Sequence, residues 1–166
     1  MKNKSFRKIS LLGFLACLGL LGFGLYLELG EGIEPCPLCI LQRITFLLLA
    51  VIFLISALHN PKEVGRNVYN VLIFIVSCFG IYLSFRQLWL QTHPLSVEVC
   101  APSFNYMWNN WPFSQVLVTM FRGTSDCAEV SWTLLGLSMP SWSLIWFVIF
   151  ALVAPVQWIM SKVTRD

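Results

Sequence analysis

Residues Pro35–Leu58 read PCPLCILQRITFLLLAVIFLISAL. The first part of this segment, Pro35–Arg43, places a Cys-x-x-Cys pair at the start of a long apolar run. An α-helix needs roughly 20 mostly apolar residues to cross the hydrocarbon core of a bilayer, and this run is long enough. The segment therefore predicts a membrane-spanning helix that carries two thiols at one end.

The composition of the whole chain extends this prediction. Of the 166 residues, 57% are hydrophobic and only 11% are charged, whereas soluble domains carry about 25% charged residues. We therefore expect an all-α membrane protein, a bundle of four transmembrane helices, with residues 1–166 forming a single domain. The expected spans are Ile9–Leu29, Ile40–Leu58, Val68–Leu90 and Ser141–Met160.

The basic residues predict how the bundle is oriented. Most of the eleven Lys and Arg residues flank the spans on one side, which the positive-inside rule makes cytoplasmic. Both termini are then cytoplasmic, and the loops 30–39 and 91–140, which are rich in acidic residues, lie outside. The net charge of +3 follows from this asymmetry and gives no indication of nucleic-acid binding. The basic residues on the cytoplasmic side are Lys2, Lys4, Arg7, Lys8, Lys62, Arg66, Lys162 and Arg165.

The N-terminal segment has a second interpretation. A basic start followed by an apolar run is also typical of a cleaved signal peptide. Here the run is about 20 residues, longer than a signal core. We therefore expect the segment to stay in place as the first span.

The six cysteines divide according to this topology. Two lie within spans, where a cysteine usually serves as a small buried apolar residue. Four lie on the outer side, where compartments permit disulfide bonds. Four cysteines allow three connectivities, and the sequence does not select one. The cysteines within spans are Cys17 and Cys78, and those on the outer side are Cys36, Cys39, Cys100 and Cys127.

The Cys-x-x-Cys pair has features of a reactive dithiol. Pro37 suits the first position of a helix, which places Cys36 at the cap and Cys39 at the third helical position. The unpaired backbone N–H groups and the helix dipole there favour a thiolate. Arg43 lies one turn beyond Cys39 on the same face, and a cation in that position adds to the effect.

Two less specific interpretations compete with a reactive dithiol. The pair could form a structural disulfide, although so short a loop hardly restrains an unfolded chain. The four outer cysteines could instead bind structural zinc, which Cys-x-x-Cys fits. However, Cys100 and Cys127 are 27 positions apart and do not repeat that spacing.

Two arginines lie near the outer ends of spans. Arginines there commonly extend toward the interface, and Arg86 fits that simple role. Arg43 shares a helix face with a reactive sulfur, and its planar group is well suited to bind a quinone carbonyl. His93 is a further candidate for a residue that contacts a bound quinone.

The long outer loop also contains an apolar stretch. Pro112 precedes the run from Phe113 to Phe121, which predicts either a short helix at the membrane interface or a packed loop core. In both cases Cys100 and Cys127 flank an anchored segment. Such a segment could carry a disulfide between a soluble partner and Cys36.

Four motifs together resemble the family of bacterial disulfide bond formation protein B, DsbB. They occur in the family's order and cover nearly the whole chain, whereas Cys-x-x-Cys alone would be a weak signal. The motifs are Pro35–Cys39 with Arg43, Phe85–Gln91, Asp126–Glu129 and Trp132–Pro140.

This resemblance implies an enzyme, a multi-pass protein of the bacterial inner membrane. It would oxidise a periplasmic DsbA-like thioredoxin-fold oxidase and pass the electrons to the quinone pool, either ubiquinone or menaquinone. By analogy, the partner's thiolate attacks Cys100, Cys127 is released and exchanges with Cys36, and Cys39 is freed to face the quinone.

The resemblance also implies that Arg43 and Met139 line the quinone site, while His93 is harder to align. A vitamin-K-epoxide-reductase-like enzyme is an alternative with the same chemistry, disfavoured by the order of the motifs. A transporter or a structural membrane protein is the alternative from a different class. The spans, however, carry no Asp, Glu or Lys at mid-depth, where a transporter would be expected to place ionisable groups.

Overall fold

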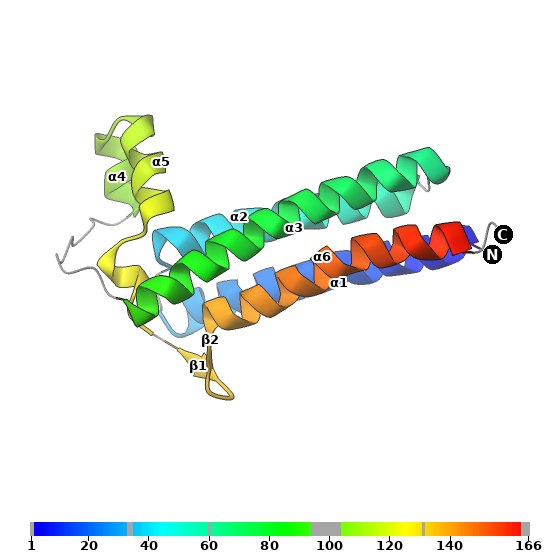
Figure 1. Ribbon diagram of the computed structural model, residues 1–166. Coiled ribbons are helices and arrows are strands. Elements are labelled where there is room, and N and C mark those ends of the chain that lie inside the picture. The colour runs from blue at the N-terminus through cyan, green and yellow to red at the C-terminus, as the bar shows by residue number, and fades with distance from the viewer. Residues whose placement is uncertain (1, 33–34, 60, 94–103, 131, 164–166) are drawn as a thin grey trace.

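The computed structural model describes residues 2–32, 35–59, 61–93, 104–130 and 132–163. Four long helices dominate the fold (Figure 1), and each is long and apolar enough to cross a membrane. The prediction of an all-α bundle with four membrane-spanning helices is thus confirmed. The helices are α1 (Lys2–Gly30), α2 (Pro37–His59), α3 (Glu63–Thr92) and α6 (Met139–Val163).

Aromatic and aliphatic side chains hold the four helices together. Helix α2 packs against α1 and α3, and α3 packs against α6. At the centre the rings of Phe46 and Phe147 stack with centroids 4.1 Å apart. Many large apolar side chains on the outside of the bundle remain exposed, among them Leu12, Leu47 and Ile75. Such a surface is stable against lipid and not against water.

The two cysteines within the spans have different environments. Cys17 in α1 is completely buried in the central cluster of apolar side chains, as expected. Cys78 in α3 is exposed on the outside of the bundle. The expectation of burial was therefore wrong for Cys78, because it points away from the neighbouring helices.

The two ends of the bundle differ. The start of α1, the end of α6 and the connection between α2 and α3 lie together at one end (Figure 1). The opposite end carries α4 (Phe104–Asn110), α5 (Phe113–Arg122), the short 3₁₀ turn η1 (Ser125–Cys127) and a small hairpin. This second end also carries the Cys-x-x-Cys pair.

Helix α5 follows Pro112, and the prediction of a short helix there is confirmed. Its buried side chains are Val116 and Met120, while Phe113 and Val118 are exposed. A helix with apolar side chains on its open face suits a membrane interface. That location stays a prediction. Helix α4 was not predicted from the sequence.

A two-stranded hairpin precedes α6. Strand β1 (Thr133–Leu134) pairs antiparallel with β2 (Leu137–Ser138). The two residues between them, Leu135 and Gly136, both have positive φ, as the tight turns of two-residue hairpins require. This hairpin was not predicted from the sequence, because its strands have only two residues each.

Candidate functional site: a cysteine cluster beside a cavity

The start of α2 has the predicted geometry. Pro37 is the first helical residue, and the carbonyl of Cys36 accepts the backbone N–H of Ile40 at 3.1 Å. Cys36 is therefore the capping residue, and Cys39 lies in the first turn. Proline fits the first position because it has no N–H that would need a partner.

Three sulfur atoms meet at this helix start. The sulfur of Cys36 lies 3.1 Å from that of Cys39, and a hydrogen bond also joins Cys36 to Cys127. The single S–H of Cys36 can donate to only one of these two sulfurs at a time. Cys127 is fully buried, and it accepts hydrogen bonds from the backbone N–H groups of Thr124 and of Leu38 in α2. Cys36 is thus the central sulfur, in contact with both of the others.

A glycine allows the chain to bring Cys127 to this position. Gly123, directly after α5, has φ +78°, a conformation that side-chain-bearing residues rarely adopt. A Cβ atom there would lie 2.5 Å from Leu90 and 2.9 Å from Leu38. The absence of a side chain therefore lets the segment before η1 pack closely on α2 and α3.

The hydrogen bonds in the cluster distinguish the acidities of Cys36 and Cys127. Hydrogen bonds with Cys127 and Cys39, together with burial, raise the pKa of Cys36 well above its ordinary value. The hydrogen bond from Cys36 lowers the pKa of Cys127 to about 6, although burial acts in the opposite direction. In the reduced protein Cys127 is therefore mostly a thiolate at neutral pH, which is the nucleophilic form.

This difference predicts how Cys127 responds to pH. In the fully reduced protein, the rate of Cys127 alkylation should rise with a midpoint near pH 6, because its pKa is about 6. The substitution Cys36→Ala removes the principal hydrogen bond and should move the midpoint upward by at least one unit. Alkylation by iodoacetamide across a pH series, quantified by mass spectrometry of the Cys127 peptide, measures both midpoints.

The same shift contributes to stability. A thiol whose pKa is lowered by folding stabilises the folded state above its unfolded pKa, and this contribution is lost as the pH falls through about 6.

An alkylation midpoint of Cys127 above pH 8 in the unsubstituted protein would contradict the proposed cluster. So would a midpoint that Cys36→Ala leaves unchanged.

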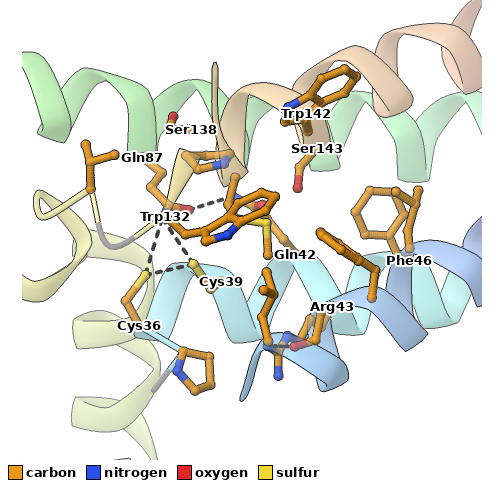
Figure 2. A pocket seen from close by; sticks show the side chains of 18 of the residues that line it. Cys36, Cys39, Gln42, Arg43, Phe46, Gln87, Trp132, Ser138, Trp142 and Ser143 are labelled. Carbon is orange, nitrogen blue, oxygen red and sulfur yellow. Dashed lines mark hydrogen bonds between the residues drawn. The ribbon is translucent and has the colours of Figure 1, made fainter. Parts of the chain in front are cut away.

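Two glutamines extend the cluster toward the cavity (Figure 2). The side-chain amide of Gln87 in α3 donates to the sulfur of Cys39 at 3.1 Å and to that of Cys36 at 3.4 Å. The amide of Gln42 in α2 donates to the carbonyl oxygen of Gln87 at 2.8 Å. Both glutamine side chains are buried.

Arg43 of α2 is held by two residues of α1. Its guanidinium donates to the carbonyl of Gly24 in α1 at 2.9 Å and forms an ion pair with Glu28. A Cβ atom at Gly24 would lie 3.4 Å from the Arg43 Nε, so glycine lets α1 approach the arginine closely. A guanidinium has five N–H donors, so these two partners leave donors available for a ligand.

These elements enclose a cavity of about 330 Å³. Cys36, Cys39 and Arg43 all line it, as Figure 2 shows. Its walls are largely apolar, and Trp132 from the hairpin segment packs against Phe23 with ring centroids 5.4 Å apart. The residues that line it also include Gln42, Phe46, Gln87, Gln91, Met139, Trp142 and Trp146.

The remaining predicted site residues have varied positions. Met139, at the start of α6, lies in the cavity wall. His93 ends α3 and stacks on Trp89 with centroids 4.4 Å apart, and it is not among the described residues that line the cavity. Arg86 donates to the carbonyl of Arg122 outside the cavity. Cys100 lies outside the described residues.

Some residues of the site were not predicted from the sequence. Gln42 lies between Cys39 and Arg43, and Gln87 lies within the second motif, but nothing in the sequence indicates that they contact each other. The ion pair of Glu28 with Arg43 was also missed, because nothing in the sequence shows that these two helices bring the residues together. Each of these contacts joins two different helices.

The fold and the site define a class of protein. It is a multi-pass membrane protein whose cysteine cluster opens onto an apolar cavity with a guanidinium in its wall. Residues 6–157 match the family Disulfide bond formation protein DsbB. The chain therefore belongs to the DsbB family, and the resemblance noted from the sequence is confirmed.

Relatives from several bacteria support this assignment. Disulfide bond formation protein B of Hahella chejuensis is 48% identical over 154 residues, covering 92% of this chain and 93% of that protein. The protein of that name from Xanthomonas oryzae is 48% identical over 150 residues, covering 89% and 87%. Disulfide bond formation protein B 1 of Pseudomonas aeruginosa is 45% identical, covering 92% and 94%. The chain is thus a membrane protein of disulfide bond formation.

Proposed function

We propose that this protein is a protein-dithiol:quinone oxidoreductase that oxidises a DsbA-like thioredoxin-fold partner. The observation that carries this proposal is the shared position of Cys36, Cys39 and Arg43 in the wall of one cavity. A disulfide formed at these sulfurs is open to exchange with Cys127 on one side. On the other side the same pair faces a space suited to an electron acceptor.

The first thiol step rests on the family resemblance, and the contact of Cys36 with Cys127 supports the second. The partner's thiolate attacks Cys100 of a Cys100–Cys127 disulfide, which forms a mixed disulfide and releases the Cys127 thiolate. That thiolate attacks Cys36 of a Cys36–Cys39 disulfide, which forms Cys36–Cys127 and releases the Cys39 thiolate. The hydrogen bond that Cys127 accepts from Cys36 supports the attack of Cys127 on Cys36. In exchange reactions of this kind a thiolate displaces a thiolate, so no net oxidation occurs within the chain.

The cavity fits the head group of a quinone. Such a ring is flat and apolar with carbonyl oxygens, and it suits aromatic walls with a few polar donors. Trp142 and Met139 would contact the ring, and Arg43 would donate to a carbonyl oxygen. The bound quinone supplies the oxidising power, accepting the two electrons and two protons that leave the dithiol as the disulfide forms.

We further propose that the cavity end of the bundle faces the periplasm, with the protein in the bacterial inner membrane. The distribution of basic residues supports this orientation. In intact spheroplasts a membrane-impermeant maleimide should label the variant Glu31→Cys, at the cavity end. It should not label Lys62→Cys, in the connection at the opposite end, until the membrane is disrupted. Both positions are exposed, and the reverse pattern would contradict the orientation.

A turnover assay tests the function directly. The purified protein is mixed with a short-chain quinone and a reduced DsbA-like partner, and the quinone absorbance is followed. We expect the absorbance to fall catalytically and the partner to become oxidised in step with it. No loss of absorbance with all four outer cysteines intact would contradict the proposed function.

A further inference from the structure

We propose that Gln87 is a catalytic residue that stabilises the reduced Cys36–Cys39 pair, and that Gln42 positions it. The consequence is that the disulfide of this pair becomes a stronger oxidant. Gln87 would act on the equilibrium between the dithiol and the disulfide of this pair. Its importance for turnover rests on the proposed function, but the equilibrium can be measured without quinone or partner.

The contacts of Gln87 place one donor group against both reacting sulfurs. Its Nε2 atom lies 3.1 Å from the sulfur of Cys39 and 3.4 Å from that of Cys36. Cys39 also receives the S–H of Cys36. A sulfur approached by two donors is well suited to carry negative charge, because hydrogen bonds to a charged acceptor are about twice as strong as neutral ones.

Gln42 determines which end of the Gln87 amide faces the sulfurs. The last torsion of a glutamine side chain is broad and roughly two-fold, so the amide can turn either its oxygen or its nitrogen toward a neighbour. The Nε2 atom of Gln42 donates to the Gln87 oxygen at 2.8 Å. Reversal of Gln87 would place two N–H groups together and its oxygen against the sulfurs. The pair of glutamines therefore fixes the donor toward Cys36 and Cys39.

Burial gives these hydrogen bonds their effect. The side chains of Gln42 and Gln87 are 4% and 3% exposed, and at low local dielectric a hydrogen bond is stronger than in water. A disulfide sulfur carries no charge and accepts hydrogen bonds only weakly, whereas a thiolate accepts them strongly. Gln87 therefore stabilises the reduced state more than the oxidised state, and this difference shifts the equilibrium toward the dithiol.

The reaction that measures this shift is exchange with glutathione. The Cys36–Cys39 disulfide is reduced as two glutathione thiols are oxidised to glutathione disulfide, with two electrons and two protons transferred. The full-length protein is equilibrated without quinone in buffers of increasing glutathione ratio. Free thiols are then trapped by alkylation, and mass spectrometry of the peptide that carries both cysteines gives the reduced fraction.

We expect Gln87→Leu to shift this equilibrium toward the disulfide by about tenfold or more, because it removes a donor to a charged sulfur. Gln87→Glu keeps the size of the side chain but replaces the donor with a carboxylate, so the shift should be at least as large. Gln42→Glu, whose carboxylate accepts the Gln87 N–H groups and draws them from the sulfurs, should resemble Gln87→Leu.

Gln91→Leu is the matched control. Gln91 is also in α3 and lines the same cavity, but its oxygen accepts from Ser138. This variant should stay within about twofold of the unsubstituted protein. The proposal is overturned if Gln87→Leu and Gln87→Glu leave the glutathione equilibrium within twofold, or if Gln91→Leu shifts it equally. Because no quinone or partner is present, this outcome is independent of the turnover assay.

Discussion

Replacing Cys39 with serine is expected to reduce quinone-dependent oxidation of the DsbA-like partner to background. A serine cannot form a disulfide with Cys36, so no oxidised pair faces the cavity and the exchange with Cys127 has no acceptor. The turnover assay measures this as the rate of quinone absorbance loss. The amount of Cys39→Ser protein recovered from the membrane should be similar to that of the unsubstituted protein, because a thiol and a hydroxyl differ little in size.

The control for this prediction is Cys78→Ser. Cys78 is exposed on the outside of the bundle, away from the cluster, and its loss should leave the rate unchanged. A membrane protein with merely structural disulfides would instead lose stability in Cys39→Ser and show no quinone reduction in any form. Cys39→Ser retaining more than a tenth of the rate would contradict the account of the site.

The second large effect is expected at Arg43. Arg43→Met should raise the KM for a short-chain quinone about 10- to 100-fold. A hydrogen bond to a charged donor contributes about 1.5–3 kcal/mol, and each 1.4 kcal/mol is a tenfold change in affinity. Among the described residues that line the cavity, Arg43 is the only Lys or Arg. Steady-state rates over a quinone concentration series separate KM from kcat.

Two further substitutions make this test specific. Arg43→Lys keeps the charge but loses the planar fork of donors. Its KM for the quinone should therefore lie between that of the unsubstituted protein and that of Arg43→Met. Arg86→Gln removes an arginine that also lies near the outer end of a helix but bonds Arg122 outside the cavity. An equal rise of KM in Arg86→Gln would show that the effect is one of general charge and would contradict a specific role for Arg43.

The fold was largely predictable because its physical signals are local. A run of apolar residues as long as the bilayer is thick indicates a span by itself, and the observed helices end within a few residues of most predicted bounds. The order Cys36-Pro37 likewise indicates a helix start. Arg43 and Cys39 share a helix face because of their spacing, and the structure places both in the cavity wall.

The contacts between helices could not be predicted in this way. The bond of Gln42 to Gln87 joins residues 45 positions apart, and the contact of Cys127 with Cys36 depends on the bend at Gly123. Such pairs form only when α2, α3 and the segment after α5 are packed together. The position of His93 could not be predicted for the same reason. Its ring stacks on Trp89 of α3, and it is not among the described residues that line the cavity.

A single-turnover experiment tests the central claim most directly. The fully reduced protein is mixed without oxygen with one equivalent of a short-chain quinone, and no partner is added. We predict about one quinol per chain, because one disulfide forms as two electrons leave, and mass spectrometry should find that disulfide between Cys36 and Cys39. Quinone that stays oxidised, or quinol formed while both cysteines can still be alkylated, would contradict the account.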